Sequence, residues 1–339
     1  MRPKLLFIPL FLLLLALGSC RHAGTSTSDQ KTDTLPPKQA WALVVHGGAG
    51  ALREEVPGEE LDAQYRESLT QALYAGRKIL EDGGTALDAV ETTIRMLEDN
   101  PLFNAGKGAT FTHDGRNELD ASIMDGSNLG AGAVAAVTDI KNPISAARAV
   151  MAHSQHVMLS GAGASEFARE QGLEMVSPSY FHTYRKWNDL QEILKKEKLG
   201  TVGCVALDRQ GNLAAGTSTG GMANKRYNRI GDSPVIGAGT YASNATCAIS
   251  CTGHGEYFIR YAVAHDISAL MEYKGLSIRE AAELVVMDKL VKAGGAGGVI
   301  GVDHRGNITM TFNTEGMFRA FATADGSEGV FIFGDEVSD

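Results

Sequence analysis

The residue placed most favourably for chemistry is Thr201, which follows Gly200 and opens an alternating run that predicts a strand over residues 202–207. If the bond between Gly200 and Thr201 were cut, Thr201 would carry a free α-amine beside its own hydroxyl. An α-amine has an unperturbed pKa of about 7.7–8.0, so near neutral pH it can take the hydroxyl proton, as in threonine N-terminal nucleophiles. The alternative is an ordinary junction between a loop and a strand.

A second hydroxyl-rich segment, residues 217–221 (TSTGG), ends the next predicted strand, over 213–218. Residues 208–212 have the composition of a hairpin turn, so antiparallel pairing would return Thr219 to the neighbourhood of Thr201. A hydroxyl there could hydrogen-bond the free amine and tune its pKa. The alternative is a polar strand end whose hydroxyls bond to their own backbone.

Arg229 and Asp232 place a guanidinium and a carboxylate three residues apart on a loop that also contains glycine and proline. Arginine binds a carboxylate through two parallel hydrogen bonds, and aspartate pairs with an ammonium group. Together the two side chains could hold an α-amino acid by both of its charged ends. A salt bridge on a surface loop is the alternative.

Thr252 and Gly253 lie between a strand predicted over 244–251 and a helix predicted over 256–273. A threonine hydroxyl and a glycine N–H at the start of a helix would suit an oxyanion hole. Thr252 is also a candidate N-cap for that helix, which is compatible with the first role. We interpret His254 as a structural or rim residue, because an N-terminal threonine needs no second base.

The elements that must position these residues are helices in pairs and strands in hairpins, which predict an α+β fold of antiparallel sheets covered by helices. The predicted helices are 59–81, 85–97 with Thr85 as its N-cap, one starting at 142–143, 256–273 and 277–292. The further predicted strands are 41–45 ending at a glycine turn, 118–124, 131–137, 235–238, 298–303 and 307–312.

Composition excludes some classes of partner. The 339 residues carry a formal net charge of −9, which argues against a nucleic-acid partner. The run Gly161-Ala162-Gly163 lacks the rest of a nucleotide-binding fingerprint, and there is no phosphate loop. Beyond residue 20 the cysteines are three, Cys204, Cys247 and Cys251, without metal-type spacing, so we interpret them as small buried apolar residues.

The N-terminus has the pattern of a targeting segment. Arg2 and Lys4 precede an almost wholly apolar run over 5–17, and small residues then lead to Cys20. This predicts a lipoprotein-type signal over residues 1–20, with Cys20 lipidated as the mature N-terminus; a plain secretory signal and an uncleaved anchor are the alternatives. Its removal would make the formal charge two units more negative. Residues 21–40 predict a flexible tether, residues 180–199 an exposed junction, and the location would be the cell envelope, on the periplasmic side or at an outer membrane.

Taken together, these segments resemble the plant-type L-asparaginase/isoaspartyl peptidase family of N-terminal-nucleophile hydrolases. The resemblance runs from about Trp41 to Phe321 and rests on eight strings in the family's order. They are 46–50 (HGGAG), 101–108 (PLFNAGKG), 118–121 (ELDA), 200–203 (GTVG), 217–222 (TSTGGM), 229–234 (RIGDSP), 251–256 (CTGHGE) and 312–317 (FNTEGM).

The resemblance implies a four-layer αββα sandwich formed by residues 41–339 as a single domain. It further implies cleavage of the chain by itself before Thr201 into segments 21–200 and 201–339, and pairing of such cleaved protomers into dimers. The implied roles are Thr201 as nucleophile with Thr219 assisting, Thr252 and Gly253 as oxyanion hole, Asn104 beside the site, Arg229, Asp232, Gly253 and Gly255 at the substrate, and His46, Gly47 and Gly48 as a loop that shapes cleavage at Gly200.

No cofactor is implied, but the segment 97–107 is similar to the family's sodium-stabilised loop, which binds the ion largely through backbone oxygens. The corresponding positions are Leu97, Glu98, Asn100, Phe103, Ala105 and Lys107. Lys107 is a cation where the family's pattern leads us to expect an apolar residue.

The activity implied is hydrolysis of the side-chain amide of β-aspartyl (isoaspartyl) dipeptides and of L-asparagine, which yields L-aspartate. One alternative is a glycosylasparaginase, although residues 219–225 look more like the asparaginase branch. The alternative from another class is an envelope binding lipoprotein that has the fold without catalysis.

Overall fold

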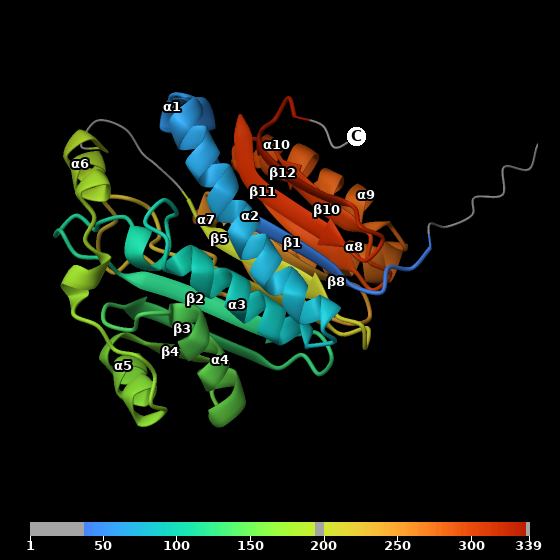
Figure 1. Ribbon diagram of the computed structural model, residues 1–339, viewed down its shortest axis with the longest axis horizontal. Coiled ribbons are helices and arrows are strands. Elements are labelled where there is room, and N and C mark those ends of the chain that lie inside the picture. The colour runs from blue at the N-terminus through green and yellow to red at the C-terminus, as the bar shows by residue number, and fades with distance from the viewer. Residues whose placement is uncertain (1–36, 194–199, 337–339) are drawn as a thin grey trace, which may run out of the picture. The chain divides into compact units, whose positions relative to one another are not determined.

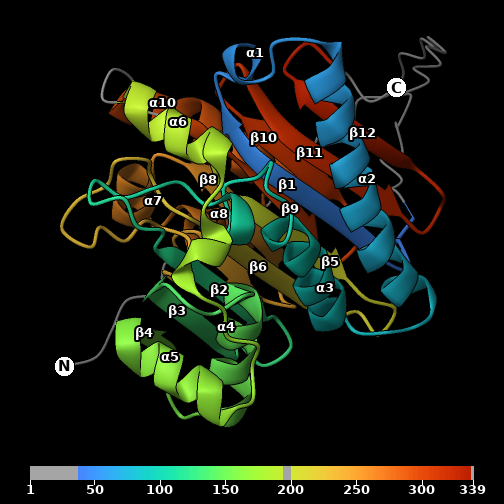
Figure 2. The same cartoon turned by 60° about the vertical axis from the view of Figure 1, so that its left-hand side comes forward.

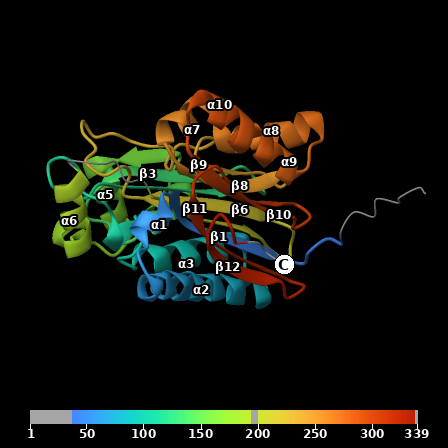
Figure 3. The ribbon, with the colours of Figure 1, turned by 90° about the horizontal axis from the view of Figure 1, so that it is seen from above.

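Two β-sheets lie face to face with helices on both outer faces in the computed structural model, which describes residues 37–193 and 200–336 (Figures 1 and 3). The larger sheet has the order β12 (Glu328–Phe333), β11 (Gly316–Thr323), β1 (Ala42–Gly50), β5 (Val202–Leu207), β6 (Leu213–Thr219), β2 (Leu119–Asp125), β3 (Ala131–Val137) and β4 (Met158–Ser160). The smaller one has the order β10 (Ile308–Phe312), β9 (Gly297–Asp303), β8 (Cys247–Gly253) and β7 (Thr240–Ala242). All pairs of strands are antiparallel except β3 with β4.

Strand β1 shows why the sheets stack. Successive side chains of a strand point to opposite faces. Leu43 and Val45 pack into a core shared with the helices, and Ala42 and Val44 pack into a core shared with the smaller sheet. A strand that is buried on both faces can be apolar throughout, as β1 is over its first half.

Three hydrophobic cores separate the four layers. The first lies between the larger sheet and helices α2 (Glu59–Glu81), α3 (Ala86–Glu98) and α4 (Pro143–His153), and Figure 2 shows α2 and α3 crossing that sheet. The second lies between the sheets. The third lies between the smaller sheet and α8 (Val263–Lys274), α9 (Ile278–Glu283) and a π-helical segment, η3 (Leu284–Leu290). The αββα sandwich of the α+β class is therefore confirmed.

The remaining helical elements have ten residues or fewer. They are α1 (Leu52–Glu55), η1 (Gly106–Gly108), α5 (Gly161–Glu170), η2 (Pro178–Phe181), α6 (Tyr184–Ile193), α7 (Gly255–Tyr261) and α10 (Val291–Ala293). No helix among the residues that the structure describes is long and apolar enough to cross a membrane.

Several elements agree with the sequence. Helix α2 has the predicted bounds, and the Thr85 hydroxyl caps α3 by accepting the Asp88 N–H at 3.1 Å. The hairpin of β5 and β6 and that of β9 and β10 are both present. Cys204 on β5 and Cys247 and Cys251 on β8 are buried and form no disulfide within the described residues, and burial raises the pKa of the Cys247 thiol to about 12.

Other elements differ. Residues 235–238 form no strand and make only an isolated bridge between Ile236 and Thr240. The helix predicted over 256–273 is broken at Ala262, whose φ of 47° is left-handed and ends α7. The glycines after Val45 do not form a turn, because β1 continues to Gly50 through a bulge between His46 and Gly48.

The predicted signal over 1–20, Cys20, residues 21–36 of the tether and residues 194–199 of the junction lie outside the described residues. The last part of the predicted tether is attached to the body. The Gln39 N–H donates to the Arg305 carbonyl at 2.8 Å, and its side chain donates to Asp325 at 2.7 Å.

Candidate active site

Thr201 directly precedes β5, the strand that lies between β1 and β6 in the larger sheet. The residue is only 6% exposed. Val202 pairs with Ser218, so the hairpin returns Thr219 to Thr201 as its register requires. The Thr201 hydroxyl donates to the Thr219 hydroxyl oxygen at 3.2 Å. The two hydroxyls that the sequence places 18 residues apart therefore touch.

Two donors converge on the carbonyl oxygen of Gly200. The Asn104 amide Nδ2 donates to it at 2.6 Å and the Thr219 hydroxyl at 3.0 Å. The Thr219 oxygen also accepts the Gly221 N–H at 2.9 Å. Two donors on one carbonyl oxygen form the arrangement that stabilises an oxyanion when that carbonyl is attacked.

Asn104 is held in a single orientation. Its Nδ2 also donates to the Gly221 carbonyl at 2.8 Å, and its Oδ1 accepts the Thr110 N–H at 2.9 Å. Because a backbone N–H can only donate, the contact with Thr110 assigns the amide oxygen and therefore places the amide nitrogen toward Gly200.

His46 lies on β1 rather than in a loop, and so do Gly47 and Gly48, which corrects the loop expected there. His46 Nδ1 lies 3.1 Å from the Thr201 carbonyl oxygen, and Nε2 lies 3.0 Å from the Ser250 hydroxyl. A carbonyl only accepts, so these contacts assign the proton to Nδ1. Burial lowers the pKa of His46 to about 3, so the ring is neutral.

Gly48 lies against the bond between Gly200 and Thr201. A Cβ built on it would come within 3.4 Å of both Gly200 Cα and Thr201 N, and its φ is +116°. A β-bulge with glycine therefore lets β1 approach this bond closely.

Thr252 lies on β8, with its hydroxyl buried and without a hydrogen-bond partner among the described residues. Ser250, two residues earlier on the same face, contacts Thr217 through their hydroxyl oxygens at 2.7 Å. Thr252 therefore lies on the side of Ser250 that is nearer to Thr219, the last residue of β6. The alternative that Thr252 caps the next helix is wrong, because the N-cap of α7 is His254.

Arg229 forms an ion pair, but its partner is Glu256. Nε and Nη2 donate to the two oxygens of Glu256 at 2.8 and 2.9 Å. The alternative of a loop salt bridge therefore holds for Arg229, although not with Asp232. This pairing still leaves other guanidinium N–H groups for a ligand.

Asp232 is 4% exposed, and its Oδ2 has no hydrogen-bond partner among the described residues. Burial raises the pKa of its carboxyl to about 7. A Cβ on Gly255 would come within 2.8 Å of Arg229 Nη2 and 2.9 Å of Asp232 Oδ1. Arg229 and Asp232 therefore converge on the Gly255 backbone, where only glycine leaves room for both.

The predicted sodium loop is compact. Gly106 packs on the Glu98 carbonyl, and Gly108 packs on the carbonyls of Phe103 and Pro101, since a Cβ at either glycine would come within 2.8 Å of those oxygens. The carbonyls of Leu97 and Ala105 accept the N–H groups of Asn100 and Gly108.

The side chains of this loop face other partners. Glu98 Oε1 accepts from the Ser218 hydroxyl at 2.7 Å, and burial raises the pKa of this carboxyl to about 8. Asn100 donates to the Ser68 hydroxyl, and the Lys107 amine lies 5.4 Å from the centre of the Tyr180 ring. The amine of Lys107 thus lies over an aromatic ring.

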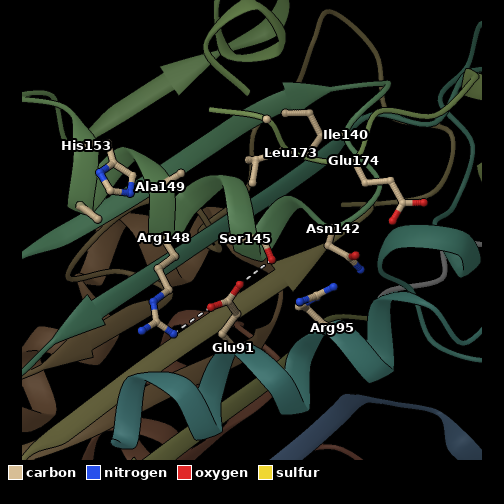
Figure 4. A pocket seen from close by; sticks show the side chains of 12 residues that line it. Glu91, Arg95, Ile140, Asn142, Ser145, Arg148, Ala149, His153, Leu173 and Glu174 are labelled. Carbon is tan, nitrogen blue, oxygen red and sulfur yellow. Dashed lines mark hydrogen bonds and ion pairs between the residues drawn. The ribbon is translucent and has the colours of Figure 1, made fainter. Parts of the chain in front are cut away.

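A polar pocket of about 360 Å³ lies elsewhere, between α3, α4 and residues 172–174 (Figure 4). In it Arg148 pairs with Glu91 at 2.8 Å. None of the residues predicted for the site lines it. Beside Gly200 itself there is a cavity of about 20 Å³, lined by Gly48 and Asn104 among others, which is enough for about one water molecule.

The chain is similar to known proteins over most of its length. A family model described as asparaginase matches residues 39–332. The chain is 50% identical to the isoaspartyl peptidase of Escherichia coli (strain K12) over 314 residues, which cover 87% of this chain and 98% of the relative. It is 43% identical to the plant-type L-asparaginase of Pyrococcus abyssi, covering 83% and 95%. It is also 43% identical to the isoaspartyl peptidase/L-asparaginase of Xenopus laevis, covering 81% and 90%.

The fold and the matched family together define an amide hydrolase of the N-terminal-nucleophile class. Within that class, the chain belongs to the asparaginase family.

Sequence reasoning assigned no role to Glu256, Ser250 or Lys225, although all three contact predicted site residues or their neighbours. Glu256 ends the string 251–256, and its position in the first turn of α7 was the available signal. The contacts of Ser250 depend on how the sheets stack, and those of Lys225 depend on β2 lying beside β6, neither of which the sequence reveals.

Proposed function

We propose that the chain cuts itself between Gly200 and Thr201, and that Thr201 then hydrolyses the side-chain amide of β-aspartyl dipeptides and L-asparagine. The observation that carries this proposal is the Gly200 carbonyl oxygen, which accepts from Asn104 and Thr219 while the Thr201 hydroxyl donates to Thr219. The nucleophile, the bond and the donors for an oxyanion are therefore together in the intact chain.

In the cleavage step, the Thr201 hydroxyl oxygen attacks the Gly200 carbonyl carbon. Asn104 Nδ2 and the Thr219 hydroxyl stabilise the oxyanion, and the carbon–nitrogen bond then breaks with a proton passing to the nitrogen. Water hydrolyses the resulting ester. The products are a carboxylate on Gly200 and a free amine and hydroxyl on Thr201.

In the hydrolytic reaction, the free amine accepts the hydroxyl proton as the Thr201 oxygen attacks the side-chain carbonyl carbon of the substrate. The Thr252 hydroxyl and the Gly253 N–H would stabilise the oxyanion. The leaving amine takes the proton and departs as ammonia or as an amino acid. Water then releases L-aspartate from the ester.

The clamp of Arg229 and Asp232 supports an aspartyl substrate with free α-carboxylate and α-amine. Both substrate classes present these two groups and differ only in the leaving amine, and the relatives carry the names of both activities. Asp232 Oδ2 and the Thr252 hydroxyl lack partners among the described residues, and a bound substrate could supply them.

The experiment that tests this proposal compares turnover of a β-aspartyl dipeptide, L-asparagine and a glycosylated asparagine by the purified protein, after its chains are separated on a denaturing gel. We expect two chains, the smaller starting at Thr201, and release of aspartate from the first two substrates. Faster turnover of glycosylated asparagine would indicate a glycosylasparaginase. A persistent single chain without turnover would indicate the binding lipoprotein and overturn the proposal.

We also propose that sodium stabilises the loop over 97–107 through its backbone oxygens, since carbonyl oxygens are ligands that hard cations prefer. Replacing sodium with a bulky organic cation should then lower the melting temperature. An unchanged melting temperature would contradict the proposal that sodium stabilises this loop.

Export as a lipoprotein through residues 1–20 and Cys20 is a further proposal, together with a dimer of cleaved protomers and a place in the cell envelope. Mass spectrometry of the mature N-terminus, with Cys20→Ser as the control, tests the lipid. Light scattering of the protein without residues 1–20 tests the dimer.

A further inference from the structure

Lys225 is a lysine whose side chain is only 1% exposed. Lysine is almost never fully buried unless it is paired, so this position calls for an explanation. The amine donates to the Glu118 carbonyl at 3.1 Å and lies 3.7 Å from the Glu118 carboxylate. Lys225 therefore connects the start of β2 with the turn that follows β6.

The same side chain packs against Gly221. A Cβ built on Gly221 would come within 3.0 Å of Lys225 Nζ and 3.2 Å of its Cδ, and the φ of Gly221 is +79°. The turn over 219–221 is thus narrow at this point, and the lysine occupies the space where a larger residue would have its side chain.

Gly221 is hydrogen-bonded to both side chains that donate to the Gly200 carbonyl oxygen, those of Thr219 and Asn104. Its N–H donates to the Thr219 hydroxyl oxygen at 2.9 Å, and its carbonyl accepts from Asn104 Nδ2 at 2.8 Å. A shift of Gly221 would therefore move the Thr219 hydroxyl and the Asn104 amide together.

Asp120, on the neighbouring strand β2, also lies close to Thr219 and Lys225. It pairs with Thr219 across β2 and β6, and its Oδ1 accepts the Ala136 N–H at 2.8 Å. Its carboxyl is buried, which raises its pKa, and the charge of Lys225 is the largest opposing effect. The lysine thus has two acidic neighbours, Glu118 and Asp120.

We propose that Lys225 is a positioning residue that fixes the turn over 219–221, so that the Thr219 hydroxyl and the Asn104 amide stay directed at the Gly200 carbonyl. After cleavage the same contacts keep Thr219 beside the Thr201 hydroxyl. Lys225 acts through Gly221 and touches no substrate. The proposal rests on the proposed function, because it concerns the groups around Thr201.

The competing role for Lys225 is to neutralise Glu118 and Asp120, without any effect on geometry. The two roles differ in what they change. Loss of neutralisation lowers the melting temperature, whereas loss of positioning slows each step that uses Thr219 and leaves substrate binding by Arg229 and Asp232 intact.

The test is Lys225→Met, which keeps the length of the side chain and removes the charge. We expect self-cleavage and kcat for a β-aspartyl dipeptide to fall about 10- to 100-fold, the range that a displacement of about 1 Å produces. KM should stay within about twofold of wild type. Rates are expressed per mole of folded protein, and kcat per mole of cleaved chain.

Lys289→Met is the control for loss of a paired lysine far from the turn, because Lys289 is partly exposed and pairs with Asp266 at 2.8 Å in the helical layer outside the smaller sheet. It should lower the melting temperature without changing either rate. If the single variant folds poorly, the double variant Lys225→Met with Asp120→Asn replaces it. The second substitution removes the buried carboxylate that would otherwise lack the charge of Lys225. The double variant should fold more stably than the single variant and still be cut slowly.

Cleavage and kcat within twofold of wild type in a folded Lys225→Met protein would overturn the positioning role, and so would a loss that lies wholly in KM. Failure of both variants to fold would assign Lys225 to stability and equally overturn it. Absence of cleavage in the wild-type chain, or turnover by Thr201→Ala, would instead refute the proposed function. The two failures are therefore distinguishable.

Discussion

The polar atoms around the bond between Gly200 and Thr201 are paired with one another, whereas two buried atoms of the residues predicted to bind substrate and its oxyanion have no partner among the described residues. On the first side, the Thr219 oxygen accepts two hydrogen bonds and donates one, and Asn104 uses both amide hydrogens. On the second side, Asp232 Oδ2 and the Thr252 hydroxyl have no partner in the part of the chain that the structure describes.

Each buried polar group without a partner lowers the stability of the fold by about 1–3 kcal/mol. The difference between the two regions therefore indicates different roles. The first region is complete within the chain and suits a reaction of the chain on itself. The second region lacks what a ligand with an ammonium group and an oxyanion would bring. Four predictions test this division, from the largest expected effect to the smallest.

Thr201→Ala should remove both reactions, because it removes the oxygen that attacks in each. We expect the chain to remain intact and turnover to fall on the order of 10⁴-fold or more. A denaturing gel and an assay of released ammonia measure the two effects. Efficient cleavage before residue 201 in this variant would contradict the assignment of the nucleophile.

Asn104→Ala should slow self-cleavage about 10²-fold, the loss that follows from removing one donor to an oxyanion. The time course of precursor loss measures it. Asn244→Ala is the matched control, since this amide contacts Asn212 and Leu213 at the opposite end of β6. Equal rates in the two variants would mean that the Gly200 carbonyl does not depend on Asn104.

Arg229→Ala should leave self-cleavage unchanged and raise KM about 10- to 100-fold, because hydrogen bonds to charged groups contribute about 1.5–3 kcal/mol. Glu256→Gln should raise KM by a few fold at most, since its carboxylate is half exposed and only orients Arg229. Slower self-cleavage in Arg229→Ala would show that Arg229 takes part in self-cleavage as well as in substrate binding, which would contradict the separate roles of the two regions.

The pKa of Asp232, raised to about 7 by burial, predicts a dependence of KM on pH. Below that value the carboxyl is protonated and cannot pair with the substrate ammonium, so KM should rise as the pH falls, by up to about tenfold per pH unit. Above it, KM should be level. In Asp232→Asn the KM should be higher and independent of pH across this range, whereas a retained dependence would point to another group.

The sequence alone predicts the parts of the site that depend on local order. The register of the hairpin between β5 and β6 follows from alternation and a short turn, so the meeting of Thr201 with Thr219 is predictable. The burial of the three cysteines follows from the apolar strands that carry them.

Contacts between distant layers could not be predicted. His46 bonds to Ser250 across the two sheets, and Lys225 reaches Glu118 on a neighbouring strand. The first contact depends on how the sheets stack, and the second depends on the order of the strands in the larger sheet, which places β6 beside β2. The pairing of Arg229 with Glu256 rather than Asp232 was missed because burial removes Asp232 from the surface, while the helix start leaves Glu256 in reach.

The order of the larger sheet has a consequence for a chain cut before Thr201. Strands β1, β2, β3 and β4 precede the cut, and β5, β6, β11 and β12 follow it, yet β1 lies between β11 and β5, and β6 lies next to β2. The two fragments would therefore interleave within one sheet and share three ladders of backbone hydrogen bonds. They would come apart only when the sheet itself unfolds, so exchange of fragments between molecules should be as slow as global unfolding.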